Sequence, residues 1–124
     1  MNGMILVTLG GAFGSLCRYL LSSWVVAQTA GASFPWGTFA VNVLGCAVGG
    51  AVTAGAQYTE WLTPQWRLFL FTGILGGFTT FSAFSLETLN LLKSGQTALA
   101  FAYVLSSEAI GVAVMAIVFA ANAR

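Results

Sequence analysis

The residues best suited to binding chemistry form one segment, Thr72 to Ser85, in the middle of a long apolar stretch. This segment contains three glycines, two adjacent threonines and two serines. Glycine and β-branched residues both weaken a helix, so the composition predicts a break. In lipid a break frees N–H and C=O groups, which persist only where they bind something or line a polar cavity. Because broken helices at mid-membrane hold ions in transporters and channels, we interpret this segment as the functional element.

Neutral hydrogen-bonding side chains recur at helical spacing in two other apolar stretches. Thr38 and Asn42 lie four residues apart, as do Tyr103 and Ser107, so each pair shares one helix face. A carboxamide within hydrocarbon must find partners. For Asn42 the sequence leaves two kinds open, another helix or a permeant species.

Two phenylalanines, Phe81 and Phe84, lie three residues apart on either side of Ser82. Such a stripe ordinarily faces lipid or packs in a core. An aromatic ring nevertheless carries partial positive charge at its edge. Ring edges together with hydroxyl and amide donors would suit a small anion that must pass without being trapped.

Three charged residues, Arg18, Glu87 and Glu108, fall inside apolar stretches, where a charge costs at least about 2.5 kcal/mol unless it is paired or hydrated. Arg18 is near enough to a span end to lie in an aqueous mouth that attracts anions. Glu87 would neutralise Arg18 or cap local structure. Structural pairing or snorkelling is the alternative for all three, and the sequence assigns no role to Glu108.

The elements that carry these residues follow from composition. The chain of 124 residues is 58% hydrophobic and 6% charged, whereas soluble domains carry roughly 25% charged residues. A helix needs about 20 apolar residues to cross a bilayer. Four stretches qualify, at about residues 4–27, 36–57, 66–92 and 97–121. We therefore predict an all-α integral membrane protein, a single domain over residues 1–124, whose four transmembrane helices include a third that is broken at mid-membrane.

The same composition excludes several classes of function. A net charge of +1 leaves no basic face for nucleic acid. The chain has no histidine, and it offers no nucleophile–base pair or metal-ligand cluster. We predict that it is not an enzyme.

The charged residues also give little preference for one orientation in the membrane. With four spans, Arg67 and Arg124 lie on one side, and Lys93 with Arg18 lies on the other. This near balance provides no positive-inside bias. Four short helices are also too few to shield a polar path from lipid. We therefore expect insertion in both orientations and assembly as an antiparallel homodimer.

Three motifs spanning the chain resemble those of the Fluc (CrcB) fluoride channels, in the same order and at the family's length. They are Gly10-x-x-x-Gly14-x-x-x-Arg18-Tyr19, Gly37-Thr38-x-x-Val41-Asn42, and Thr72-Gly73-x-x-Gly76-Gly77-x-Thr79-Thr80-Phe81-Ser82-x-Phe84-Ser85-x-Glu87. The resemblance implies a dual-topology antiparallel homodimer with two pores. Such a dimer would reside in the bacterial inner membrane and export cytoplasmic fluoride passively, relieving its toxicity.

The resemblance also implies roles for individual residues. The backbone carbonyls of Gly76 and Thr79 from both subunits would hold a central structural Na⁺, and Arg18 would shape an electropositive vestibule. The implied pore residues are Asn42, Phe81, Phe84, Thr38, Ser82, Tyr103 and Ser107. The fourth span departs from the family pattern at Glu108 and at Gly111, where some members have a hydroxyl.

Two other functions fit part of the sequence. Small multidrug exporters are also dual-topology proteins with four helices, and Glu108 could be their membrane-embedded carboxylate, but that acid belongs to the first helix, which has none here. A non-transporting packing subunit would explain the glycines, but it would not explain the break or Asn42.

The expected antiparallel assembly can be tested by fixing the orientation. Several lysines added at one terminus should lock the chain in one orientation, because the native bias is so weak. Transport in reconstituted vesicles should then require an oppositely locked partner. Unchanged transport by one locked form alone would show that the assembly is not antiparallel.

Overall fold

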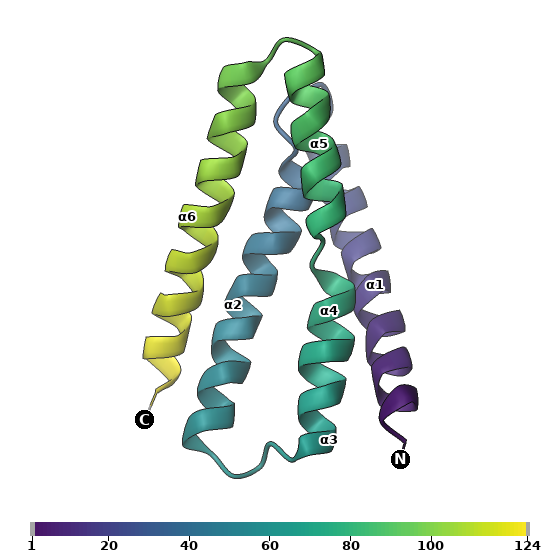
Figure 1. Cartoon of the computed structure of the whole chain (residues 1–124), viewed down its shortest axis with the longest axis vertical. Coiled ribbons are helices and arrows are strands. Elements are labelled where there is room, and N and C mark those ends of the chain that lie inside the picture. The colour runs from purple at the N-terminus through teal and green to yellow at the C-terminus, as the bar shows by residue number, and fades with distance from the viewer. Residues whose placement is uncertain (1, 124) are drawn as a thin grey trace.

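The computed structural model describes residues 2–123, and within that range every regular element is a helix (Figure 1). The helices form four spans that are long and apolar enough to cross a membrane, which confirms the predicted fold class. The elements are α1 (Gly3–Gln28), α2 (Trp36–Tyr58), α3 (Pro64–Arg67), the π-helix η1 (Leu68–Leu75), α4 (Gly76–Phe78), α5 (Phe81–Lys93) and α6 (Thr97–Asn122). The third span comprises α3, η1, α4 and α5, from Pro64 to Lys93.

The helices run up and down, so that the connections alternate between two ends (Figure 1). The start of α1, the end of α6 and the α2–α3 connection lie at one end, and the other two connections lie at the opposite end. Arg67 is the last residue of α3, which lies at the first of these ends. Arg124, which the charge count also placed there, lies outside the described residues.

The third span breaks where the sequence predicts it. α4 ends at Phe78, and Thr79 (φ −81°, ψ 154°) and Thr80 (φ −144°, ψ 117°) are extended. The hydroxyl of Thr80 then accepts a hydrogen bond from the Ala83 N–H at 3.2 Å, which caps the start of α5 as threonine commonly does. The threonine pair therefore ends one helix and begins the next.

Glycines bring α1 against the first half of the third span. A Cβ added at Gly10 would lie 2.6 Å from the Phe69 carbonyl oxygen, and one added at Gly77 would lie 2.5 Å from the Gly11 carbonyl oxygen. A Cβ at Gly14 would overlap the Ile74 carbonyl oxygen. Small residues permit such approaches where hydrophobic association in water is absent. This packing fixes the depth of the break.

Few side chains are buried in the isolated chain. Val41 and Tyr103 are fully buried, whereas Phe81 is 80% exposed and Ile117 is 68% exposed. Exposed apolar surface of this extent suits contact with lipid or another protein chain.

The glycine packing leads to a prediction with a matched neighbour as control. Gly10→Ala should destabilise the fold by about 1–3 kcal/mol, because the new methyl meets backbone that cannot move aside. Gly11→Ala should be neutral or stabilising, since its nearest new contact is 4.0 Å away and alanine favours helix. Thermal unfolding in detergent would measure both variants. Equal melting temperatures for the two would contradict the packing argument.

Candidate functional site

The carboxamide of Asn42 on α2 bridges the break in the third span. Its Oδ1 accepts the Thr80 backbone N–H at 2.9 Å, and its Nδ2 donates to the Thr80 carbonyl at 3.1 Å. One side chain thus satisfies both backbone groups of an extended residue, as a neighbouring strand would. Of the two kinds of partner that the sequence left open for Asn42, the structure contains the first.

The Asn42 bridge also releases a carbonyl. In a continuous α-helix the Thr80 N–H would donate to the carbonyl of Gly76, four residues earlier. In the same way the Ala83 N–H would donate to Thr79, but it donates to the Thr80 hydroxyl instead. Both carbonyls therefore lose their helical donors, and both Gly76 and Thr79 are exposed.

Arg18 on α1 binds a third carbonyl at the break, that of Gly77. Its Nε donates to the Gly77 carbonyl at 3.1 Å, and the Ser15 hydroxyl donates to the same oxygen at 3.5 Å. The cation lies at the C-terminal end of α4, where carbonyl groups concentrate negative potential. Arg18 therefore supports the break directly.

Glu87 on α5 accepts hydrogen bonds from two hydroxyl groups on different helices. Thr38 Oγ1 donates to Oε1 at 2.6 Å, and the Tyr103 hydroxyl donates to Oε2 at 2.7 Å. Neither bond involves Arg18, which the sequence offered as a partner; both tie α5 to its neighbours α2 and α6. A hydroxyl has a single proton, so Thr38 and Tyr103 both direct theirs at this carboxylate.

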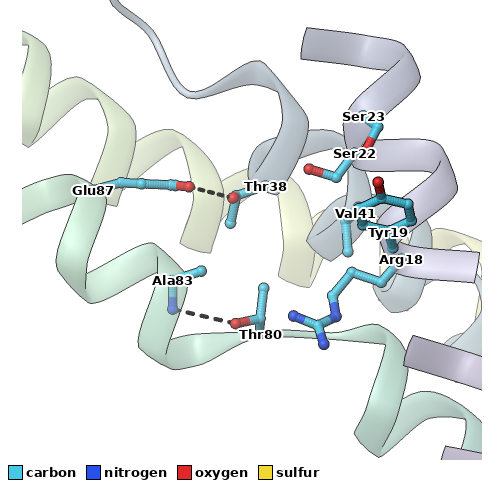
Figure 2. A pocket seen from close by; sticks show the side chains of 9 residues that line it. All are labelled: Arg18, Tyr19, Ser22, Ser23, Thr38, Val41, Thr80, Ala83 and Glu87. Atoms are coloured by element: carbon cyan, nitrogen blue, oxygen red, sulfur yellow. Dashed lines mark hydrogen bonds between the residues drawn. The ribbon is translucent and has the colours of Figure 1, made fainter. Parts of the chain in front are cut away.

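One pocket of about 270 Å³ opens beside Arg18, and we call it the Arg18 pocket (Figure 2). In Figure 2 the guanidinium points into the pocket toward Thr80, and Glu87 lies across from it beside Thr38. The lining is one cation, one acid and several hydroxyls. Its residues are Arg18, Tyr19, Ser22, Ser23, Thr38, Val41, Thr80, Ala83 and Glu87.

A second pocket, of about 320 Å³, shares Thr80 with the first, and we call it the Phe81 pocket. It is lined by Asn42, Cys46, Thr79, Thr80, Phe81, Phe84, Ser107 and Glu108. The rings of Phe81 and Phe84 are 6.1 Å apart, and Phe84 packs on Tyr103 at 4.9 Å. The Ser107 hydroxyl oxygen is buried without a hydrogen-bond partner among the described residues. This hydroxyl is therefore free to bind a ligand or water.

The structure thus brings most of the predicted site residues together in two groups. Arg18 and Thr38 line the Arg18 pocket, whereas Asn42, Phe81, Phe84 and Ser107 line the Phe81 pocket. Tyr103 on α6 lines neither pocket, and its hydroxyl donates to Glu87 on α5. Ser82 is exposed and lines neither pocket.

Sequence reasoning missed two features of this site. Glu87 was recognised as a buried charge, but nothing in the sequence pairs it with Thr38 and Tyr103, which are 49 and 16 residues away. Cys46 on α2 also lines the Phe81 pocket, although it lies outside the three motifs. Its spacing of four residues from Asn42 was the available signal.

Comparison with known proteins shows similarity to one family over most of the chain. A family model described as CrcB-like protein, Camphor Resistance (CrcB), matches residues 5–119. The fluoride-specific ion channel FluC of Rhizobium meliloti is 45% identical over 117 residues, covering 94% of this chain and 91% of that protein. The protein of the same name from Methylobacillus flagellatus is 46% identical over 115 residues, covering 93% and 90%. Another, from Leptospira interrogans, is 43% identical over 111 residues, covering 90% and 87%.

The Asn42 bridge predicts a specific loss of stability. Asn42→Asp keeps an acceptor for the Thr80 N–H but replaces the donor with an oxygen that faces the Thr80 carbonyl. Leaving that carbonyl unsatisfied should cost about 1–3 kcal/mol, measured as a lower melting temperature in detergent. Asn90→Asp, on the exposed face of α5, is the control and should change little. Equal stability of the two variants would show that the bridge does not support the break.

Proposed function

This chain belongs to the CrcB-like family, and from that premise we propose that it is a fluoride-selective channel through which fluoride leaves the cell passively. The observation that carries the proposal is the broken third span, whose ends are bound by Asn42 and Arg18 between two polar pockets. The chain is a multi-pass membrane protein, and we assign it to a bacterial inner membrane. An ion channel catalyses no covalent reaction, so no enzymatic activity is proposed.

The chemistry of the two pockets suits an anion that holds its water tightly. Fluoride must exchange its hydration shell for several donors at once, and neutral donors do this without trapping it. The Phe81 pocket offers the rings of Phe81 and Phe84 and the Ser107 hydroxyl, which has no hydrogen-bond partner within residues 2–123. The Arg18 pocket offers a guanidinium that would attract the anion from water. We therefore assign Arg18 to the vestibule and the Phe81 pocket to the pore.

Three of the predicted donors already form hydrogen bonds within the chain. Thr38 and Tyr103 donate their single hydroxyl protons to Glu87, whereas Asn42 donates to Thr80 through one of the two N–H groups of its amide. We propose that Thr38 and Tyr103 reach fluoride only by exchanging those hydrogen bonds for the ion, and that Asn42 donates to it through its second N–H group. Ser82, which lines neither pocket in the single chain, would act only at a surface completed by a second subunit.

We propose that the channel is an antiparallel homodimer with two pores. The single chain leaves Phe81 80% exposed at a pocket that is open to its surroundings, and a pore for an anion must be closed from lipid. A second copy in the opposite orientation would supply the missing wall. The near balance of charge between the two ends is compatible with both orientations.

The freed carbonyls fit a structural Na⁺ at the centre of that dimer. The carbonyls of Gly76 and Thr79 have lost their helical donors, and both residues are exposed. Carbonyls at the ends of broken membrane helices are the groups that coordinate Na⁺. Bound there, the ion would neutralise converging carbonyl dipoles and hold two subunits together.

Fluoride efflux from liposomes, followed with a fluoride electrode, tests the function and the assigned pore residues. Wild-type protein should release fluoride rapidly, whereas Phe81→Ile and Phe84→Ile should slow release by about tenfold or more through the loss of ring-edge contacts. Phe101→Ile is the control, because Phe101 is exposed on α6 and lines neither pocket. Efflux should also slow when Na⁺ is replaced by a large organic cation.

Three results of this assay would contradict the proposals separately. Absence of fluoride release by the wild-type protein would contradict the channel function. Wild-type rates in both pore variants would remove Phe81 and Phe84 from the pathway. Unchanged efflux, together with an unchanged dimer, after exhaustive Na⁺ removal would exclude the structural cation.

A further inference from the structure

Four aromatic rings in contact lead from the α1–α2 connection to the Phe81 pocket, and we call them the aromatic row. The ring of Phe34 lies 5.3 Å from that of Tyr103, and the ring of Tyr103 lies 4.9 Å from that of Phe84. Phe84 in turn lies 6.1 Å from Phe81. Aromatic pairs interact at centroid separations of about 4.5–7 Å. The orientation of each ring therefore depends on the next ring in the row.

Tyr103 is the best fixed member of the aromatic row. It is fully buried, and its hydroxyl donates to Glu87 at 2.7 Å. Its ring meets Phe34 edge-on at an interplanar angle of 78° and meets Phe84 at 50°. A ring in a close-packed interior keeps its orientation only while its neighbours fill the surrounding space. Loss of the Phe34 ring would leave such a space beside Tyr103, and Phe84 would lose a firm support.

The sequence of the α1–α2 connection fixes the place of Phe34. Gly31, at φ +85°, turns the chain after α1, and Pro35 restricts the residue before it to extended backbone. The Phe34 carbonyl accepts a hydrogen bond from the Trp36 N–H at 2.8 Å. The Phe34 ring also lies 4.4 Å from the ring of Trp36 and 5.4 Å from that of Phe39. The start of α2 thus holds Phe34 in position.

We propose that Phe34 is a positioning residue for the pore: acting through Tyr103, it holds the Phe84 ring in the orientation that presents its edge to the anion. Phe34 itself lines neither the Arg18 pocket nor the Phe81 pocket, so its effect must pass through its neighbours. A Phe84 ring that is free to tilt would present its negative face in place of its positive edge. This inference rests on the proposed channel function.

Fluoride efflux from liposomes tests the inference with variants at Phe34. Phe34→Leu keeps an apolar side chain but removes the ring, and the rate should fall by about threefold to tenfold, the effect of losing one aromatic contact. Phe34→Tyr keeps the ring and should restore the wild-type rate. Phe34 also borders a pocket of about 470 Å³ between the two connections at its end of the molecule, so the ring is not enclosed on every side.

A double-mutant cycle separates positioning from a general loss of stability. In Phe84→Ile the ring that Phe34 positions is absent, so adding Phe34→Leu should cause no further fall in the rate. Each rate is expressed per folded protein recovered from the liposomes, and slow variants are measured at higher protein density. Phe34→Met, which fills more of the space without a ring, replaces Phe34→Leu in the cycle if that variant does not fold.

Phe69→Leu is the matched control. Phe69 is partly buried like Phe34, and its ring meets that of Trp66 at 5.9 Å, but it lies in η1 and outside the aromatic row. This variant should lower the melting temperature and keep the wild-type efflux rate.

The outcomes separate this inference from the channel function. A wild-type rate in Phe34→Leu, or the same proportional fall in the wild-type and Phe84→Ile backgrounds, would overturn the positioning role and leave the channel function intact. An equal fall in Phe69→Leu would also overturn it, because the effect would then follow lost packing anywhere in the chain. Absence of fluoride release by the wild type would instead contradict the channel function.

Discussion

Unpaired backbone groups inside a lipid-facing protein are the constraint on which this structure depends. Water cannot satisfy an N–H or C=O group at mid-membrane, so the break at Thr79 and Thr80 exists only because other helices supply partners. Asn42 satisfies both backbone groups of Thr80, and Arg18 with Ser15 satisfies the Gly77 carbonyl. Two polar residues that would be costly alone are thereby stabilised by the break, and the break is stabilised by them.

The glycine contacts follow from the same constraint. A side chain as short as that of Ser15 reaches the Gly77 carbonyl only if α1 and α4 approach at backbone distance. The glycines at positions 10, 14, 73 and 77 permit that approach. The first half of the third span is thus held on α1, whereas α5 is attached to α2 and α6 through Glu87. The break therefore divides the third span into two halves with different neighbours: the first half packs on α1, and the second is bound to α2 and α6.

This arrangement divides the polar interior into two pockets of different character. The Arg18 pocket contains fixed charges of both signs, and the Phe81 pocket combines rings, an acid and the buried Ser107 hydroxyl. Thr80 lines both pockets, so the residue that interrupts the helix is also the point at which the pockets meet. For an anion the first pocket would concentrate the ion, and the second would replace its water without holding it.

The sequence by itself determined the features that depend on local composition. The length of the apolar stretches set four spans, and glycine with β-branched threonine set the place where the third helix fails. The motif segments also identified the family, because their order and spacing are readable without coordinates. The single-domain organisation over residues 1–124 and the roles of the site residues remain predictions.

Only the tertiary structure decided which polar groups meet. The bond of Asn42 to Thr80 crosses 38 residues, that of Arg18 to Gly77 crosses 59, and that of Thr38 to Glu87 crosses 49. Each depends on the rotation and depth of two helices, which are set by glycine contacts and not by any local pattern. The sequence indicated that Glu87 needs a partner. Helix packing places two hydroxyl groups, and not Arg18, within hydrogen-bonding distance of its carboxylate. The same packing placed Glu108 of α6 in the lining of the Phe81 pocket.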